Sequence, residues 1–146
     1  MTPLLSEPTT LVVDASVVLK WVLHEDGRPA ALRLLERYQD GQTTLLAPRL
    51  LLSEAANVLW KYVHRGLLTA PQATAAYDHF LVNAPRLADS SRVWAAALQL
   101  SLAHRRTAYD CLYLALALDR QCDLVTADEE FFLAVHQAFP FVQLLV

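Results

Sequence analysis

The amino-acid sequence predicts one α/β domain in which a central, mainly parallel sheet lies between two layers of helices. Short apolar stretches rich in valine and leucine alternate with longer segments whose apolar residues recur every three to four positions. Helical segments separate all the predicted strands, which favours parallel pairing with helices on both faces. The chain has 146 residues, enough for one domain with a sizeable core.

The first third of the chain sets this alternation. Residues 11–15, Leu-Val-Val-Asp-Ala, are short and apolar without alternation, which is typical of a buried strand. A short helix is expected over residues 16–24, and a longer one over residues 27–39. Asp40-Gly41 ends the longer helix, because glycine readily adopts the left-handed cap. Residues 44–47 form the second short strand.

The remaining sequence repeats the pattern. Proline at first-turn positions predicts helices over residues 48–65 and 70–83, and Gly66 ends the first of them. Residues 1–10 are expected to fray, and we find no linker or internal repeat. The other predicted elements are a strand at 85–89, helices at 90–104 and 107–121, a strand at 123–126, a helix at 128–137 and a strand at 141–145.

Composition narrows the class of protein. The apolar fraction is 55% and the charged fraction 18%, which predicts large buried faces and an apolar subunit interface. The longest uninterrupted apolar run, residues 111–118, is far shorter than the ~18–20 residues that span a bilayer. The N-terminus also lacks the basic segment of a signal peptide, so we expect a cytoplasmic protein. Cys111 and Cys122 share a predicted helix about 16 Å apart, too far for a disulfide.

Four acidic residues stand alone in apolar sequence: Asp14, Glu54, Asp110 and Asp128. A carboxylate enclosed by aliphatic side chains loses hydration, which is unfavourable by several kcal/mol unless a partner neutralises it. One or two such acids could pair with a lysine or an arginine. Four of them indicate a shared hard cation, Mg²⁺ or Mn²⁺, because these ions prefer oxygen ligands.

The predicted elements bring these acids to one edge of the sheet. Asp14 ends the first strand, and Asp128 follows the strand at 123–126. Asp110 and Glu54 lie in the first two turns of their helices. The carboxyl ends of parallel strands meet at the edge where such sheets bind ligands. The net charge of −3 lacks the positive excess of a nucleic-acid binder, but a cation on these acids would leave a nearly neutral protein.

Each acid also has a purely structural explanation. Asp110 and Asp128 could complement a helix dipole or cap a helix N-terminus. Glu54 could pair with Lys61 or Arg49, and Asp14 could cap the helix that follows it. Their joint occurrence favours a metal site over these separate roles.

Other polar residues could support such a site. Hydroxyl and amide side chains that could orient the carboxylates or a bound water belong to Ser16, Thr126 and Asn57. Basic residues that could contact a substrate phosphate, although a solvated surface role is simpler, are Lys20, Arg105 and Arg106.

Four ordered segments surround the acids, and together they cover nearly the whole chain. They read VVDASVVLKW (12–21), LSEAANVL (52–59), AYDCLYLALA (108–117) and LVTADEEF (124–131). This set resembles the motifs of PIN-domain ribonucleases, and most closely the VapC-type toxins of prokaryotic toxin–antitoxin pairs.

The resemblance implies a PIN-like α/β/α fold, a homodimer, and Mg²⁺ or Mn²⁺ held by Asp14, Glu54, Asp110 and Asp128. It also implies an RNA substrate and a cognate antitoxin protein that blocks the site. We therefore predict a metal-dependent endoribonuclease, the toxin of such a pair, in which metal-activated water hydrolyses RNA phosphodiester bonds.

Two other functions remain open from the residues. A magnesium-dependent phosphatase or phosphotransfer domain also ends its first strand with an acid. The phosphatase pattern, however, needs a second aspartate where this chain has Ser16. A non-catalytic PIN-like scaffold that binds RNA would usually lack one or more of the four acids. Only three glycines are present, so a glycine-rich phosphate loop is excluded.

Overall fold

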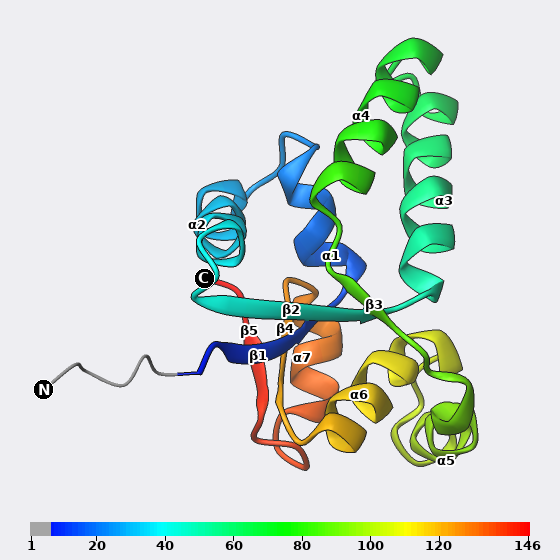
Figure 1. The fold of residues 1–146 in the computed structure, drawn as a ribbon. Coiled ribbons are helices and arrows are strands. Elements are labelled where there is room, and N and C mark those ends of the chain that lie inside the picture. The colour runs from blue at the N-terminus through cyan, green and yellow to red at the C-terminus, as the bar shows by residue number, and fades with distance from the viewer. Residues whose placement is uncertain (1–6) are drawn as a thin grey trace, which may run out of the picture.

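Five short strands form the middle layer of the computed structural model, which describes residues 7–146 (Figure 1). Their order in the sheet is β3-β2-β1-β4-β5, and every neighbouring pair is parallel. The predicted three-layer fold class is therefore confirmed. The strands are β1 Thr9–Val13, β2 Thr43–Pro48, β3 Arg86–Ala88, β4 Asp123–Thr126 and β5 Val142–Leu144.

Strand β1 lies at the centre of the sheet, and the chain extends from it in both directions. Leu11 pairs with Leu45 of β2 on one side and with Asp123 of β4 on the other. Because β2 and β3 continue one half and β4 and β5 the other, the strand order reverses between β1 and β4. The carboxyl ends of β1 and β4 therefore meet at a switch point, where α/β sheets bind ligands.

Helices connect the strands and cover both faces of the sheet. In the view of Figure 1, α1 to α4 lie above β2, and α5 to α7 lie below it. Two 3-10 turns, Leu19–Trp21 and Ser91–Val93, precede α2 and α5. The helices are α1 Ala15–Val18, α2 Arg28–Gln39, α3 Leu50–His64, α4 Ala70–Asn83, α5 Trp94–His104, α6 Ala108–Arg120 and α7 Glu129–Val135.

Capping side chains fix where several helices begin. Thr69 accepts the backbone N–H of Gln72 at 3.2 Å, and the Gln72 side chain accepts the N–H of Thr69 at 2.9 Å, which forms a capping box before α4. Thr107 caps α6 by accepting the N–H of Asp110 at 3.1 Å. Gly66, with φ of 73°, follows the end of α3 as predicted.

The observed boundaries differ from the predicted ones at the start of the chain. Strand β1 begins at Thr9, because Thr9 and Thr10 pair with Thr43 and Thr44 of β2. The expectation that residues 1–10 fray is therefore wrong for Thr9 and Thr10, while residues 1–6 lie outside the described residues. The strand ends at Val13, so Asp14 becomes the cap of α1 and no longer the last residue of the strand.

The core lies on both faces of the central strands. Val12, Val13, Leu45 and Leu124 are fully buried, and Phe80 anchors α4 without any exposed surface. Cys111 is buried and Cys122 half-buried, and both are free thiols, as the sequence predicted. The prediction that they share one helix is wrong, because α6 ends at Arg120 and Cys122 follows it. Within residues 7–146, no helix combines the length and the hydropathy needed to cross a membrane.

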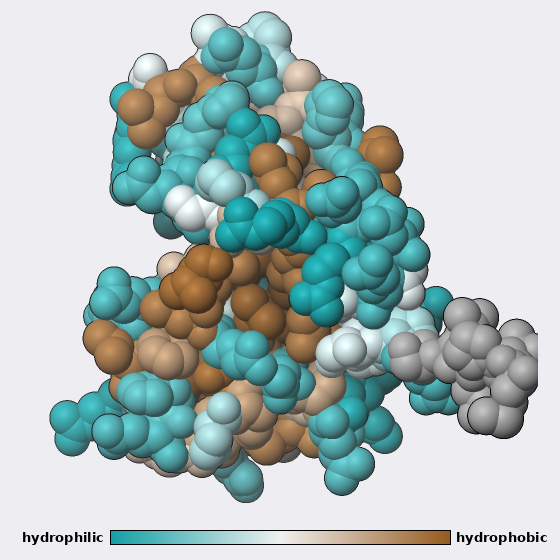
Figure 2. Space-filling model, turned by 90° about the vertical axis from the view of Figure 1, so that its left-hand side faces the viewer, coloured by the Kyte–Doolittle hydropathy of each residue, from teal (hydrophilic) through white to brown (hydrophobic). Residues whose placement is uncertain are grey.

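Parts of the surface are apolar. On the face seen in Figure 2, hydrophobic side chains gather in a hollow between two mainly hydrophilic lobes. Elsewhere α5 leaves Leu98 and Leu102 exposed, and Trp94 at its start stacks edge-to-face on Tyr109 with ring centroids 6.3 Å apart. This surface agrees with the high apolar fraction of the sequence.

We expect Leu124→Ala to lower the free energy of unfolding by about 2–5 kcal/mol, because it leaves a cavity beside the central strand. Chemical denaturation checks this. Leu133→Ala on α7, where the side chain is 60% exposed, is the matched control and should change stability by less than about 0.5 kcal/mol. Equal losses in the two variants would contradict the placement of β4 in the core.

Candidate active site

Four carboxylates from four separate segments line one pocket of about 110 Å³. Asp14 follows β1, Glu54 lies on α3, Asp110 is in the first turn of α6, and Asp128 caps α7. The structure thus brings together the four acids selected from the sequence, at the carboxyl ends of β1 and β4. The other residues of the pocket wall are Ala15, Ser16, Tyr113 and Phe131.

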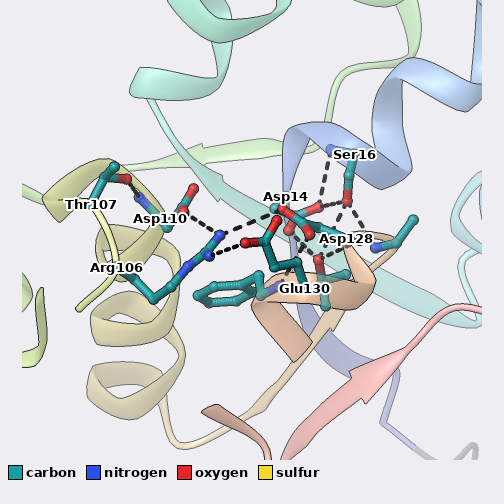
Figure 3. A network of polar contacts seen from close by, with 10 residues as sticks. Asp14, Ser16, Arg106, Thr107, Asp110, Asp128 and Glu130 are labelled. Carbon is teal, nitrogen blue, oxygen red and sulfur yellow. Dashed lines mark hydrogen bonds and ion pairs between the residues drawn. The ribbon is translucent and has the colours of Figure 1, made fainter. Parts of the chain in front are cut away.

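Two hydroxyl groups hold the carboxylate of Asp14 (Figure 3). Its Oδ1 accepts the backbone N–H of Ser16 at 3.1 Å and the Ser16 hydroxyl at 2.5 Å. Its Oδ2 accepts the hydroxyl of Thr126 at 2.5 Å. Ser16 and Thr126 therefore occupy the orienting positions that the sequence suggested for them.

The same hydroxyls connect Asp14 to the loop after β4. Ser16 Oγ accepts the N–H of Ala127 at 2.8 Å, and Thr126 Oγ1 accepts the N–H of Asp128 at 3.1 Å. Asp128 in turn caps α7 by accepting the N–H of Phe131 at 3.1 Å. Asp14 and Asp128 are thus fixed relative to each other through a short chain of hydrogen bonds.

The environment of Asp14 disfavours its charged form. Burial raises the pKa of Asp14 from its ordinary value of 3.8 to about 6. The hydrogen bonds from Ser16 and Thr126 lower this pKa, and the negative charge of Asp128 raises it. Burial is the largest of these effects, so a positive charge in the pocket would stabilise the Asp14 carboxylate.

Glu54 has a partner that sequence reasoning missed. The hydroxyl of Tyr113 donates to Glu54 Oε1 at 2.6 Å. Burial raises the pKa of Glu54, the Tyr113 hydrogen bond lowers it, and the charges of Asp14 and Asp110 raise it. Burial and the Glu54 charge also raise the pKa of Tyr113, which keeps the phenol protonated as a donor.

The sequence does not predict the contact of Tyr113 with Glu54, because Tyr113 lies inside the longest apolar run, where a tyrosine is usually a core residue. Its position three residues after Asp110 on α6 is the signal that could have found it. The alternative pairing of Glu54 with Lys61 or Arg49 is wrong, since Glu54 forms no ion pair within residues 7–146.

Asp110 and Asp128 share a basic neighbour, Arg106 (Figure 3). Arg106 Nη2 donates to Asp110 Oδ2 at 3.1 Å and lies 3.9 Å from Asp128 Oδ2. Its Nη1 lies 3.6 Å from Glu130 Oε1, and the guanidinium sits 5.7 Å from the ring centroid of Phe131. Burial raises the pKa of Asp110, while Arg106 lowers it.

Three other sequence candidates lie away from the pocket wall. Asn57 is exposed, on the side of α3 opposite to its buried stripe. Lys20 pairs with Glu25 at 3.1 Å. Arg105 is exposed and ends α5 in the left-handed conformation. Their nearness to the acids in the sequence does not place them in the pocket.

The chemistry of the pocket suits a hard divalent cation. Its four acids offer oxygen donors, and burial raises the pKa of three of them, which a cation would reverse. Within residues 7–146, however, no three acidic, histidine or cysteine side chains already converge as a metal cluster. Asp14 faces the two hydroxyls, and Asp110 faces Arg106.

Comparisons with known proteins agree with this fold. A model of the PIN domain family matches residues 11–135, which include all four acids. Ribonuclease VapC3 of Pyrobaculum aerophilum is 33% identical over 122 residues, which cover 82% of this chain and 90% of that protein.

Two solved structures share the fold. PAE2754 from Pyrobaculum aerophilum has a TM-score of 0.65 and 24% identity, covering 87% of this chain and 86% of its own. Mycobacterium tuberculosis VapC20, a sarcin–ricin loop cleaving toxin, has a TM-score of 0.63 and 16% identity, covering 86% of this chain and 95% of its own. At these identities the likeness concerns the fold alone.

The raised pKa of Asp14 makes the stability of metal-free protein depend on pH. Below about pH 4 the carboxyl is protonated in both folded and unfolded states. As the pH rises from about 4 to about 6, Asp14 ionises in the unfolded chain but keeps its proton in the folded protein, so the folded state loses up to about 3 kcal/mol of stability. Asp14→Asn should remove this part of the loss, as measured by chemical denaturation with EDTA at about pH 4.5 and about pH 7.5.

A matched control for that experiment is Asp123→Asn. Asp123 lies at the other end of β4 and is bonded to Gln143. This variant should keep the pH dependence of the wild-type protein. An equal pH dependence in wild type and Asp14→Asn would contradict the burial of the Asp14 charge.

Tyr113→Phe should raise the pKa of Glu54 further, because it removes the hydrogen bond that stabilises the carboxylate. Carboxyl carbon chemical shifts followed by NMR against pH, in EDTA, measure this change. Tyr77→Phe is the control, since the Tyr77 hydroxyl donates to the carbonyl of Leu52. An unchanged Glu54 titration in Tyr113→Phe would show that the hydrogen bond does not form in solution.

Proposed function

The chain belongs to the PIN domain family of VapC-type ribonucleases, and we propose that it hydrolyses RNA at the pocket formed by Asp14, Glu54, Asp110 and Asp128. The observation that carries this proposal is that four carboxylates from four segments line one small pocket. A fold by itself supports many functions, whereas this donor set suits phosphoryl chemistry assisted by a divalent cation.

The carboxylates would hold Mg²⁺ or Mn²⁺. Asp14 is the best oriented ligand, because Ser16 and Thr126 fix both of its oxygens. Asp110 and Asp128 approach from the starts of two helices, and Glu54 approaches from α3. When bound, a divalent cation offsets charge on the phosphate and lowers the pKa of a water nucleophile.

Glu54 is suited to accept the proton of the attacking water. Tyr113 occupies Oε1, so among the hydrogen bonds of residues 7–146 the Oε2 atom accepts none. Tyr113 therefore positions Glu54, and Oε2 receives the proton.

The substrate phosphate would lie against the first turn of α6. That helix directs free N–H groups and the positive end of its dipole toward the edge of the pocket, which favours an anion. None of the three basic residues predicted to contact phosphate lines the pocket, but Arg106 contacts two of its acids, Asp110 and Asp128. Arg106 is thus the best placed of the three.

We further propose that this ribonuclease is the toxin of a toxin–antitoxin pair in the cytoplasm, with a cognate antitoxin protein that blocks the pocket. The names and the descriptions of the two VapC relatives support this assignment. A homodimer would cover part of the exposed apolar surface, such as Leu98 and Leu102 on α5.

Asp14→Asn should reduce RNA cleavage by at least about a hundredfold, because it replaces a negatively charged ligand of the proposed cation by a neutral amide. The assay uses purified protein without antitoxin, a panel of structured RNAs, and Mn²⁺, Mg²⁺ or EDTA. Asp123→Asn, an acid at the other end of β4, should retain wild-type activity.

Wild-type cleavage by Asp14→Asn, or cleavage that persists in EDTA, would overturn the proposed site. Hydrolysis of an aryl phosphate without any RNA cleavage would instead identify a phosphatase.

A further inference from the structure

Arg106 places a positive charge beside two of the pocket acids, Asp110 and Asp128. Its side chain is largely buried, and its guanidinium faces Asp110, Asp128 and Glu130. Two of these acids, Asp110 and Asp128, are also proposed to bind a divalent cation. Two cations of different kinds would therefore use the same carboxylate oxygens.

The contacts of Arg106 are weaker than those of a structural ion pair. Only the contact with Asp110 is a hydrogen bond, at 3.1 Å, and it uses a single nitrogen where a bidentate pair would use two. The contacts with Asp128 and Glu130, at 3.9 Å and 3.6 Å, are longer. The buried Nε of Arg106 has no hydrogen-bond partner within residues 7–146.

Two neighbouring contacts fix the backbone of Arg106. A change of rotamer would therefore move its guanidinium without moving the backbone. Ser101 Oγ donates to the Arg106 carbonyl at 2.6 Å, and Thr107, the next residue, caps α6. Arg106 thus immediately precedes a helix N-terminus, where the helix dipole disfavours a cation. The acids hold the guanidinium there, and neutralising them would remove the main attraction.

We propose that Arg106 is a built-in counter-ion, which occupies the acid cluster in the metal-free protein and competes with the divalent cation for Asp110 and Asp128. This inference rests on the proposed function, because it needs the cation to bind at the same pocket. A bound cation would release the guanidinium, which Phe131 keeps close to the pocket and to an arriving phosphate.

The test measures Mn²⁺ affinity of the full chain without RNA, by isothermal titration calorimetry after EDTA treatment. Arg106→Gln should bind Mn²⁺ about tenfold more tightly than wild type, because a positive charge a few ångströms from the cation is removed. Arg105→Gln is the matched control. It removes the same charge one residue earlier, at an exposed position, and should stay within about twofold of wild type.

A second readout is thermal unfolding of the same proteins. In EDTA, Arg106→Gln should unfold at a lower temperature than Arg105→Gln, because its acids lose their counter-ion. Mn²⁺ should then raise its midpoint by more than it raises that of wild type. These two shifts in opposite directions would not follow from a general loss of folding.

An Mn²⁺ affinity of Arg106→Gln equal to or weaker than that of Arg105→Gln would overturn the inference. If the wild-type protein still binds Mn²⁺ in that case, the proposed function stands. Absence of Mn²⁺ binding in every protein would overturn both. Should Arg106→Gln fail to fold, NMR of the arginine Nε–H groups in wild type decides. The Arg106 signal should move on adding Mg²⁺ and the Arg105 signal should not; an unmoved Arg106 signal would overturn the inference.

Discussion

The crowding of four carboxylates at one edge of a buried sheet is the constraint on which the rest of this structure depends. Each of these acids would be easier to accommodate at the surface, because burial and mutual repulsion both disfavour ionised carboxylates. The raised pKa values of Asp14, Glu54 and Asp110 express this tension. Two hydroxyls, a phenol and one guanidinium partly stabilise these carboxylates. The proposed divalent cation would stabilise them further.

The fold creates that crowding through its topology. Since β1 lies between β2 and β4, the loops after β1 and β4 diverge around the switch point, and Asp14 and Asp128 face the same space. Ser16 and Thr126 bind Asp14 and the backbone after β4 at once, so they join the two loops and orient the carboxylate. Helices α3 and α6 then add Glu54 and Asp110 from opposite sides of the central strand. Packing and the proposed catalysis thus depend on the same few contacts.

The order of elements and the four candidate acids could be predicted from the sequence, because each acid interrupts an apolar run. Those runs are either short and without alternation, as in buried strands, or have helical spacing. The remaining parts of the site needed tertiary structure. Tyr113 is an aromatic residue in an apolar helix, and only its distance to Glu54 reveals its role. Arg106 lies between two acids that are distant in sequence. The prediction that Asn57 reaches the site is wrong, because Glu54 lies at the edge of the buried stripe of α3. Asn57, three residues later, lies farther from that stripe and is exposed.

The central claim is that these carboxylates bind one shared divalent cation. Anomalous X-ray diffraction from crystals grown with Mn²⁺ tests it most directly. We predict a peak in the pocket within about 2.0–2.4 Å of oxygens from Asp14 and at least one of the other three acids, with Arg106 turned away from Asp110. A peak at another site, or an empty pocket in which Arg106 still contacts Asp110 at saturating Mn²⁺, would contradict it.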